Sequence, residues 1–399
     1  MKITKHLMYI VFILLLLTLD AFALDAASVC PEDSLKFGMS TPLTGPASQL
    51  GINMRDGILT SFSEVNSSGR ISGKELCLVA VDDGYEPERT VPNMHTLLMD
   101  EKVLALVGNV GTPTAVVAIP IATRNKTLFF GALSGAGILR KMPPERYVIN
   151  FRASYAEETA AMVEGLITYG GIAANEIAFF TQRDAFGDAG FSGGMAALQR
   201  RGDFDEKLIA HGRYERNTIA VENGLADILM TNPEPKAVIM VGAYAPCAAF
   251  IKLARRIGLK ALFLNISVGA APLAQELGSS GEGVIITQVV PHYDSNEPVV
   301  VKFRKGLKEY QPQAAPSFGA LEGYLVGNIL IRALREIDRP LTREAIVDAL
   351  EGLGEFDIGL GEPLRLTKTE HQASHQVWPT IIRNGKVVPL NWAELTWKK

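Results

Sequence analysis

The chain has 399 residues, of which 47% are hydrophobic, and its formal net charge at pH 7 is −4. That length exceeds what one hydrophobic core usually serves, so two domains are expected. The weakly acidic balance argues against nucleic acid as a partner, and the hydrophobic fraction is that of an ordinary globular protein.

Residues 1–23 predict an export signal peptide. A basic start is followed by an apolar run at residues 7–17 and then by Ala21, Phe22 and Ala23, so we expect cleavage near Ala23 and an exported, soluble mature protein. The run is too short to span a bilayer, which needs about 20 apolar residues. A lipid anchor at Cys30 is the weaker alternative, because Val29 stands where such sites have a small residue.

Short apolar runs alternate with longer segments of helical period from Leu35 onward, which is typical of βαβ units and a parallel sheet. Five strands are predicted before residue 150 and five after it, so one open sheet is expected on each side of that point. The predicted strands are residues 35–39, 76–81, 103–107, 128–130, 147–151, 177–180, 208–210, 237–241, 262–264 and 284–289.

Helices fill the gaps between these strands. Residues 156–169 carry one apolar face, and residues 248–257 end at Gly258, a residue typical of helix C-termini. After residue 290 the pattern becomes mainly helical, and the chain closes with a hairpin turned at Asn384 and Gly385. These last elements are predicted at residues 298–310, 321–337, 342–350, 378–383 and 386–389.

The cysteines and histidines give no sign of a disulfide framework or a metal site. Cys30, Cys77 and Cys247 are widely spaced, and the last two lie in apolar segments, where a thiol usually behaves as a small buried hydrophobe. His371 and His375 could hold a metal together only on a helix, whereas their segment is polar and precedes a predicted strand. No metal and no other cofactor is predicted.

The loops that follow the predicted strands are the expected ligand site, because open α/β sheets bind ligands beyond the carboxyl ends of their strands. They are rich in Gly, Ser and Thr, which let the backbone approach a ligand and leave N–H groups free at helix starts. A ligand carboxylate suits such loops, although any α/β protein uses the same residues as turns and caps. They span residues 40–46, 82–87, 108–114, 131–137, 181–187, 242–246 and 265–269.

One short motif raises an enzymatic alternative. Gly190, Ser192 and Gly194 match the G-x-S-x-G pattern of a hydrolase nucleophile elbow. An elbow follows directly on a strand, whereas here the strand ends near Thr181 and a polar, glycine-rich loop follows. The motif is therefore interpreted as the glycine-rich start of a helix, and the protein is predicted not to be an enzyme.

Seven segments in order resemble the leucine/isoleucine/valine-binding family of periplasmic binding proteins, the receptor components of ABC importers. They are residues 43–51 (LTGPASQLG), 81–83 (VDD), 107–112 (VGNVGT), 151–154 (FRAS), 184–187 (DAFG), 241–244 (VGAY) and 288–291 (QVVP). The resemblance implies a monomer that captures a small molecule and delivers it to a permease and an ATPase in the inner membrane. A sensor that uses the same lobes to report to a signalling system is the alternative.

The family's fold is the type I periplasmic binding fold, with two doubly wound parallel-sheet lobes joined by a hinge of three crossing strands. It implies lobes that are discontinuous in sequence. Lobe 1 is expected to comprise residues 33–152 and 292–355, and lobe 2 residues 153–291 and 376–399.

The resemblance also implies a set of ligand contacts. The hydroxyl and N–H of Thr112 are expected to hold a ligand carboxylate, with Ser134 and Gly135 beside it. Phe186 and Tyr244 are expected to close on the ligand from the second lobe. Donors on one lobe and aromatic faces on the other suit a hinge, since the ligand then stabilises only the closed form.

The chain departs from the amino-acid binders at several of these positions. Ser267 stands where they place the carboxylate that pairs with the ligand's ammonium group, and a buried ammonium without that partner is costly. Leu50 lines the expected cleft and, like Phe186, replaces an aromatic hydroxyl. Tyr85 and Gly111 replace two cysteines that often form a disulfide. An amino acid, another carboxylate, an apolar solute and an aromatic solute all remain open.

Overall fold

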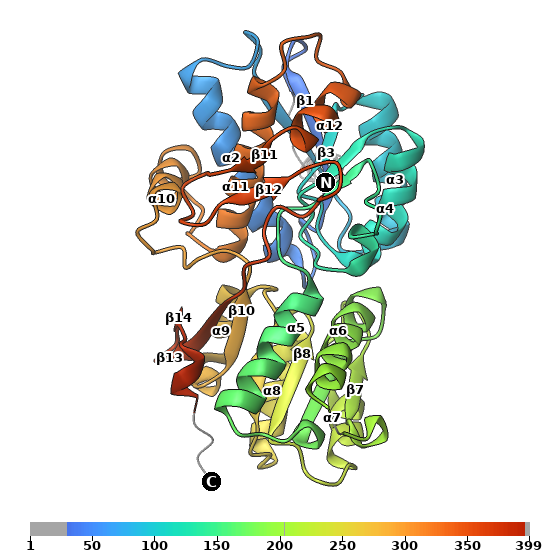
Figure 1. Cartoon of the computed structure of the whole chain (residues 1–399), viewed down its shortest axis with the longest axis vertical. Coiled ribbons are helices and arrows are strands. Elements are labelled where there is room, and N and C mark those ends of the chain that lie inside the picture. Colours follow the sequence, from blue (N-terminus) through green and yellow to red (C-terminus); the bar gives the residue numbers. More distant parts are fainter. Residues whose placement is uncertain (1–29, 203, 396–399) are drawn as a thin grey trace, which may run out of the picture.

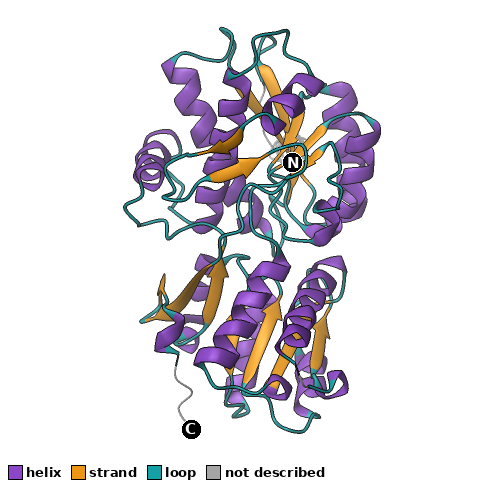
Figure 2. Cartoon of the chain, in the orientation of Figure 1, coloured by secondary structure: helices purple, strands orange, loops and turns teal. Residues whose placement is uncertain are grey.

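The computed structural model describes residues 30–395 except residue 203, and it folds them into two lobes stacked along the long axis of the molecule (Figure 1). Each lobe is a sheet surrounded by helices (Figure 2). The predicted signal peptide and its cleavage near Ala23 lie outside the described residues. Within the described part of the chain, no helix is long and apolar enough to cross a membrane.

The sheet of lobe 1 is entirely parallel and has the strand order β2-β1-β3-β4-β5. Its inner strands β3 and β4 are fully buried, as expected for a parallel sheet covered on both faces. The elements are β1 (Leu35–Thr41), α2 (Ser48–Ser68), β2 (Leu76–Asp82), α3 (Pro87–His95), β3 (Ala105–Val107), α4 (Thr112–Arg124), β4 (Leu128–Phe130) and β5 (Val148–Ile149).

The sheet of lobe 2 has the strand order β14-β13-β10-β9-β8-β6-β7, in which β6 to β10 are parallel and β13 and β14 are antiparallel. The elements that build it are α5 (Tyr155–Glu164), β6 (Ile177–Gln182), α6 (Ala185–Arg201), β7 (His211–Tyr214), α7 (Glu222–Leu229), β8 (Ala237–Val241), α8 (Tyr244–Arg256), β9 (Leu262–Asn265), α9 (Ala270–Leu277), β10 (Ile285–Gln288), β13 (Trp378–Arg383) and β14 (Lys386–Pro389).

Three helices late in the chain return to lobe 1: α10 (Pro298–Tyr310), α11 (Phe318–Arg335) and α12 (Arg343–Glu351). Helix α11 lies alongside α2 (Figure 1), and glycines set how closely the two approach. A Cβ on Gly57 would stand 2.0 Å from the carbonyl oxygen of Ala320, and one on Gly323 would stand 2.2 Å from that of Met54. A short ribbon of β11 (Gly354–Phe356) and β12 (Leu364–Leu366) follows.

The chain passes between the lobes three times: after β5, after β10 and before β13 (Figure 1). The first and third passages lie side by side, because the N–H of Asn150 donates to the carbonyl of His371 at 2.7 Å and the N–H of Ser374 donates to that of Phe151 at 2.8 Å. The exact lobe boundaries given above stay a prediction.

The cysteine interpretation was wrong for one pair. Cys30 and Cys77 form a disulfide with 5.7 Å between their Cα atoms. The sheet register explains it: β1 pairs in parallel with β2 at Leu35 and Leu76, so the segment before β1 runs beside the start of β2. Cys247 is buried and free, and it lies inside α8, which begins three residues before it.

One predicted strand was misplaced, and one helix predicted at the right residues changes from α to π form within them. The strand expected at residues 208–210 is β7 at residues 211–214, because residues 206–208 form a 3₁₀ turn capped by the carboxylate of Asp205. The helix expected to continue to residue 169 is α-helical only to Glu164 and ends in a wider π turn. Trp392 packs there, 2.4 Å from where a Cβ on Gly165 would stand.

The G-x-S-x-G motif lies within α6, not on a strand-to-helix turn. Its glycines let α6 approach its neighbours: a Cβ on Gly190 would meet Val241 at 2.5 Å, and one on Gly194 would meet Phe179 at 2.4 Å. The motif therefore serves packing, and Ser192 is not placed as a nucleophile.

Candidate ligand-binding cleft

The loops at the carboxyl ends of the two sheets meet between the lobes. Ser40 and Asp83 from β1 and the end of β2 anchor the lobe 1 side, where their side chains are hydrogen-bonded at 2.8 Å. Gln182, the last residue of β6, brings its amide to 3.5 Å from the hydroxyl of Tyr85 in lobe 1. Both residues are buried, so this is a closed contact between lobes.

The lobe 1 wall carries the two hydroxyls predicted for a ligand carboxylate. Thr112 is the first residue of α4, and its Oγ1 lies 2.8 Å from Oγ of Ser134. Both residues are fully buried. Because the first N–H groups of a helix have no partner within the helix, the start of α4 can donate to an anion beside these hydroxyls.

Tyrosines explain two of the glycines in this wall. The ring and backbone of Tyr155 lie 2.5 Å from where a Cβ on Gly135 would stand, so a hydroxyl-bearing side chain does not fit there. Likewise the ring of Tyr85 lies 2.4 Å from a Cβ on Gly111. Tyr85 and Gly111 thus pack against each other at the two positions that are often cysteines in the family that the chain resembles. Burial raises the pKa of the Tyr85 phenol well above its usual value.

The lobe 2 wall is aromatic. Phe186 is the second residue of α6. Its N–H donates to the carboxylate of Asp184 at 3.0 Å, and its ring centroid lies 5.3 Å from that of Tyr155. Tyr244 begins α8 and is 7% exposed. Burial raises the pKa of Tyr244, and hydrogen bonding to the backbone of Gln49 and to the side chain of Ser48, at the start of α2, lowers it.

Ser267 does not stand alone in the cleft, because a buried cluster of charges surrounds it. Its Oγ contacts Nη2 of Arg152 and lies 2.9 Å from Oε1 of Glu158. Nη2 of Arg152 lies 3.4 Å from the same Oε1, and Nε of Arg152 lies 3.7 Å from Oε1 of Glu322 in α11. Ser267, which stands where the amino-acid binders carry a carboxylate for the ligand's ammonium group, therefore contacts a guanidinium instead.

Burial is the main influence on the pKa values of this cluster. It raises the pKa of both Glu158 and Glu322, against the opposing charge of Arg152. Burial lowers the pKa of Arg152, but the charges of Glu322 and Glu158 outweigh this effect, so the pKa is raised. Arg152 is thus held as a cation.

Sequence reasoning missed the three charged members of this cluster. The sequence points to Arg152 only as a member of the segment 151–154 that carries the family resemblance. Glu322 carries a usable signal, since it is the single charged residue in the otherwise apolar stretch of α11 from Phe318 to Asn328. For Glu158 the sequence carries no such signal beyond its place in the first turn of α5.

A second set of contacts joins the lobes at the other side of the cleft. Arg216, which follows β7, lies 2.7 Å from the carboxylate of Glu86 and 3.3 Å from that of Asp184. The amide of Asn217 donates to the carbonyl of Gly84 at 3.1 Å and to Glu86 at 2.7 Å. These side chains fasten the loop before α3 to lobe 2.

A cavity of about 20 Å³ remains between the lobes, with room for roughly one water molecule. Leu50 and Ser267 line it, together with Leu133, Gln288, Phe318 and Glu322. It shares Asn53, Ala271, Pro272 and Ser317 with a wider recess of about 570 Å³ that opens to solvent. A solute of amino-acid size can enter only if the lobes separate.

Comparison with known proteins identifies the family. A profile described as periplasmic binding protein matches residues 34–386. The chain belongs to the periplasmic binding protein family. Such proteins are not enzymes, and this one is a solute-binding member of the leucine/isoleucine/valine-binding group.

Solved structures support this membership. A possible leucine/isoleucine/valine-binding protein from Rhodopirellula baltica is 52% identical, with a TM-score of 0.88 over 92% of this chain and 99% of that one. A substrate-binding periplasmic protein from Ralstonia solanacearum is 25% identical, with a TM-score of 0.82 over 90% of this chain and 100% of that one. The type I periplasmic binding fold is thereby shown.

The curated relatives are more distant. The Leu/Ile/Val/Thr-binding protein of Salmonella typhimurium is 22% identical over 76% of this chain and 82% of that protein. A leucine-, isoleucine-, valine-, threonine- and alanine-binding protein of Pseudomonas aeruginosa is 26% identical over 43% of this chain, and the match spans 52% of its own length.

Proposed function

We propose that this periplasmic binding protein captures a small solute in the periplasm, between its two lobes, and delivers it to the permease and ATPase of an ABC importer in the inner membrane. The observation that carries the proposal is the pairing of hydroxyls at a helix start in lobe 1, Thr112 and Ser134, with the aromatic wall of Phe186 and Tyr244 in lobe 2. Relatives named for binding branched-chain amino acids support it.

We infer that the ligand carries a carboxylate and an apolar or aromatic body. The carboxylate accepts hydrogen bonds from the hydroxyls of Thr112 and Ser134 and from the free N–H groups at the start of α4. The body packs against Leu50, Phe186 and Tyr244. Gly135 and Ser267 complete the proposed site, Gly135 by admitting the ring of Tyr155 and Ser267 through its contacts to Arg152 and Glu158.

A thermal-shift screen of amino acids, carboxylic acids and small lipids tests this function. A solute that binds only the folded protein raises the melting temperature with concentration by mass action. We expect at least one carboxylate to do so. An uptake assay with that solute, in cells with and without the protein, then decides between an importer receptor and a sensor: loss of uptake supports the importer, and unchanged uptake contradicts it.

A further inference from the structure

The carboxylate of Glu322 is buried without a hydrogen bond. Glu322 is 3% exposed, and within the described part of the chain no N–H or O–H group donates to its oxygens. Its single polar contact is the ion pair with Arg152, whose Nε lies 3.7 Å from Oε1. Buried polar groups are nearly always hydrogen-bonded, so such a carboxylate calls for an explanation.

Glu158, on the other side of Arg152, shows the contrast. It accepts from the N–H of Ser267 at 2.9 Å, from the hydroxyl of Ser267 at 2.9 Å and from the hydroxyl of Thr287 at 2.6 Å, besides its ion pair with Arg152. Glu158 is therefore fully engaged in holding lobe 2 around Arg152. Glu322 has the same charge and the same partner but keeps its acceptor capacity unused.

Glu322 also faces the place where a solute enters. It lines the cavity between the lobes, together with Ser267, Gln288 and the apolar side chains of Leu50, Leu133 and Phe318. Leu133 precedes Ser134, so the cavity adjoins the hydroxyls proposed for the ligand carboxylate. A solute held there by its carboxylate can present a neighbouring group to Glu322.

The charge balance favours a cationic group. Among the described residues, Arg152 is the one cation within ion-pair distance of the carboxylates of Glu158 and Glu322, so the two carboxylates share a single guanidinium. Arg140 lies nearby, but its hydrogen bonds go to Gln372 and to the carbonyls of Ser134, Ala136 and Arg152, not to Glu322. A protonated amine brings three donors and one positive charge, which matches what Glu322 lacks.

Resting on the proposed function, we propose that Glu322 of α11 is the residue that receives the protonated amine of the solute, in place of a carboxylate in the loop between β9 and α9. The assignment gives Ser267 its role as well: it positions Arg152 and Glu158 and leaves amine recognition to the opposite lobe. Nε and Nη1 of Arg152 also have no hydrogen-bond partner among the described residues. Arg152 is fully buried and is not among the residues that line the cavity, so we do not assign these atoms to the solute.

Matched pairs of solutes test the proposal without any mutation. L-leucine is compared with 4-methylpentanoate and L-phenylalanine with 3-phenylpropanoate by titration calorimetry, since each pair shares its carbon skeleton and differs only in the amine. We expect the amine-bearing member of at least one pair to bind about tenfold tighter or more. Equal or tighter binding of the acid that lacks the amine overturns the role of Glu322 while leaving solute binding intact. No binding by any of the four contradicts the amine assignment, and no response in the wider thermal-shift screen contradicts the proposed function itself.

Glu322→Gln then assigns the effect to this residue. The preference for the amine-bearing member should fall to about twofold or less, while binding of the acid that lacks the amine changes little. Glu336→Gln, at the exposed end of the same helix, is the matched control and should keep the preference. Circular dichroism and the melting temperature check that the variant is folded. A folded Glu322→Gln protein that keeps the full preference overturns the proposal.

Discussion

Arg216 and Glu86 form an ion pair across the cleft, with Nη2 of Arg216 2.7 Å from Oε2 of Glu86. The two residues belong to different lobes, so this contact exists only when the lobes are closed. Both side chains are partly exposed, which limits the strength of the pair to about 1 kcal/mol or less.

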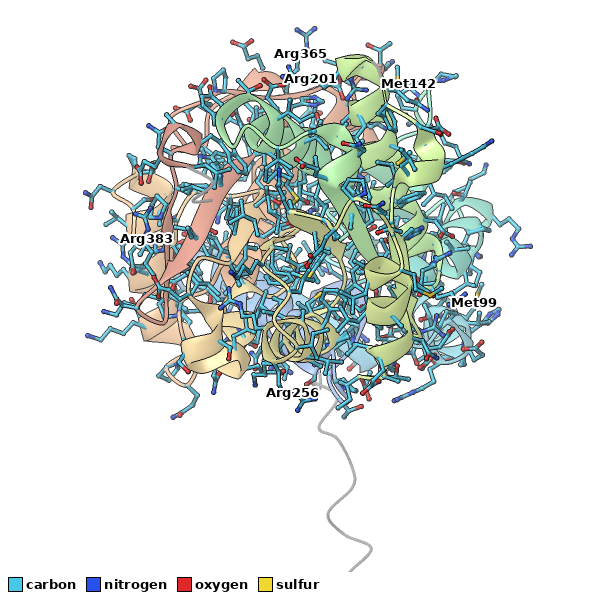
Figure 3. All side chains as sticks on the ribbon, turned by 90° about the horizontal axis from the view of Figure 1, so that it is seen from below. Met99, Met142, Arg201, Arg256, Arg365 and Arg383 are labelled. Atoms are coloured by element: carbon cyan, nitrogen blue, oxygen red, sulfur yellow. A yellow bond between two sulfur atoms is a disulfide. The ribbon has the colours of Figure 1, made fainter. Side chains whose placement is uncertain are left out.

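Arg216→Ala should therefore weaken ligand binding by about two- to fivefold, chiefly through faster dissociation, because it removes a contact that stabilises the closed form. Stopped-flow dissociation measurements check this. Arg201→Ala is the control, because Arg201 pairs at 2.8 Å with Glu164 inside lobe 2 and projects from the surface (Figure 3). An equal effect of both substitutions would show that Arg216 does not fasten the lobes.

Thr112→Val removes one hydroxyl from the proposed carboxylate site while keeping the shape of the side chain. A hydrogen bond to a charged group is worth about 1.5–3 kcal/mol, so affinity should fall by about ten- to a hundredfold. The ligand-free protein loses only the bond to Ser134, and its melting temperature should fall by a few degrees at most. Calorimetric titration and thermal melting separate the two effects; an unchanged affinity would place the ligand elsewhere.

Reduction of the Cys30–Cys77 disulfide should lower the free energy of unfolding by about 2–4 kcal/mol, since the bond closes a long loop of the unfolded chain. Ligand affinity should stay within about twofold. Cys77 lies at the start of β2, whereas the cleft lies beyond the strand ends. Urea unfolding and calorimetry with and without reductant measure both quantities, and a large loss of affinity on reduction would contradict this placement of the cleft.

His211 makes part of the stability depend on pH. Burial, followed by the charge of Arg213, lowers the pKa of His211 to about 4, while its ring stacks on Phe191. In the unfolded chain His211 takes up a proton near pH 6.5, whereas in the folded protein it does so only near pH 4. Protonation between these two pH values therefore favours the unfolded chain, and the folded protein loses stability as the pH falls from 6.5 to 4. Because the ring is partly exposed, the loss is on the order of 1 kcal/mol.

The variant His211→Gln should lack this part of the pH dependence. Urea unfolding at pH 7.5 and pH 5 gives the comparison. Wild type should lose more stability than the variant on acidification, and an equal loss in both proteins would contradict the shifted pKa of His211.

Sequence patterns were most informative where local chemistry decides the structure. Helix α10 was predicted at its observed residues, because Pro298 starts an apolar periodic run. The terminal hairpin was too, since Asn384 and Gly385 both adopt the positive φ angles that its turn requires. The predicted strands fell in the observed order, but β11 and β12 were not predicted. Strand β7 begins three residues later than predicted, because a capped turn at residues 206–208 displaces the strand start.

What the sequence could not reveal depends on tertiary contacts. The disulfide follows from the register of β1 against β2, which no local pattern encodes. The cluster of Arg152, Glu158 and Glu322 brings together a crossing segment and two helices that are far apart in the chain. Ser267 was predicted from the resemblance, but its contact with a guanidinium emerged only from the fold.

The central claim is that a solute is held between two lobes that close on it. Small-angle X-ray scattering of the purified protein, first free of solute and then saturated with a solute found by thermal shift, tests it most directly. Entry into the small closed cavity requires separated lobes, so we expect the radius of gyration to fall on saturation, and to fall less in Arg216→Ala at the same solute concentration. Saturable binding with superimposable scattering curves in the two states would contradict the account.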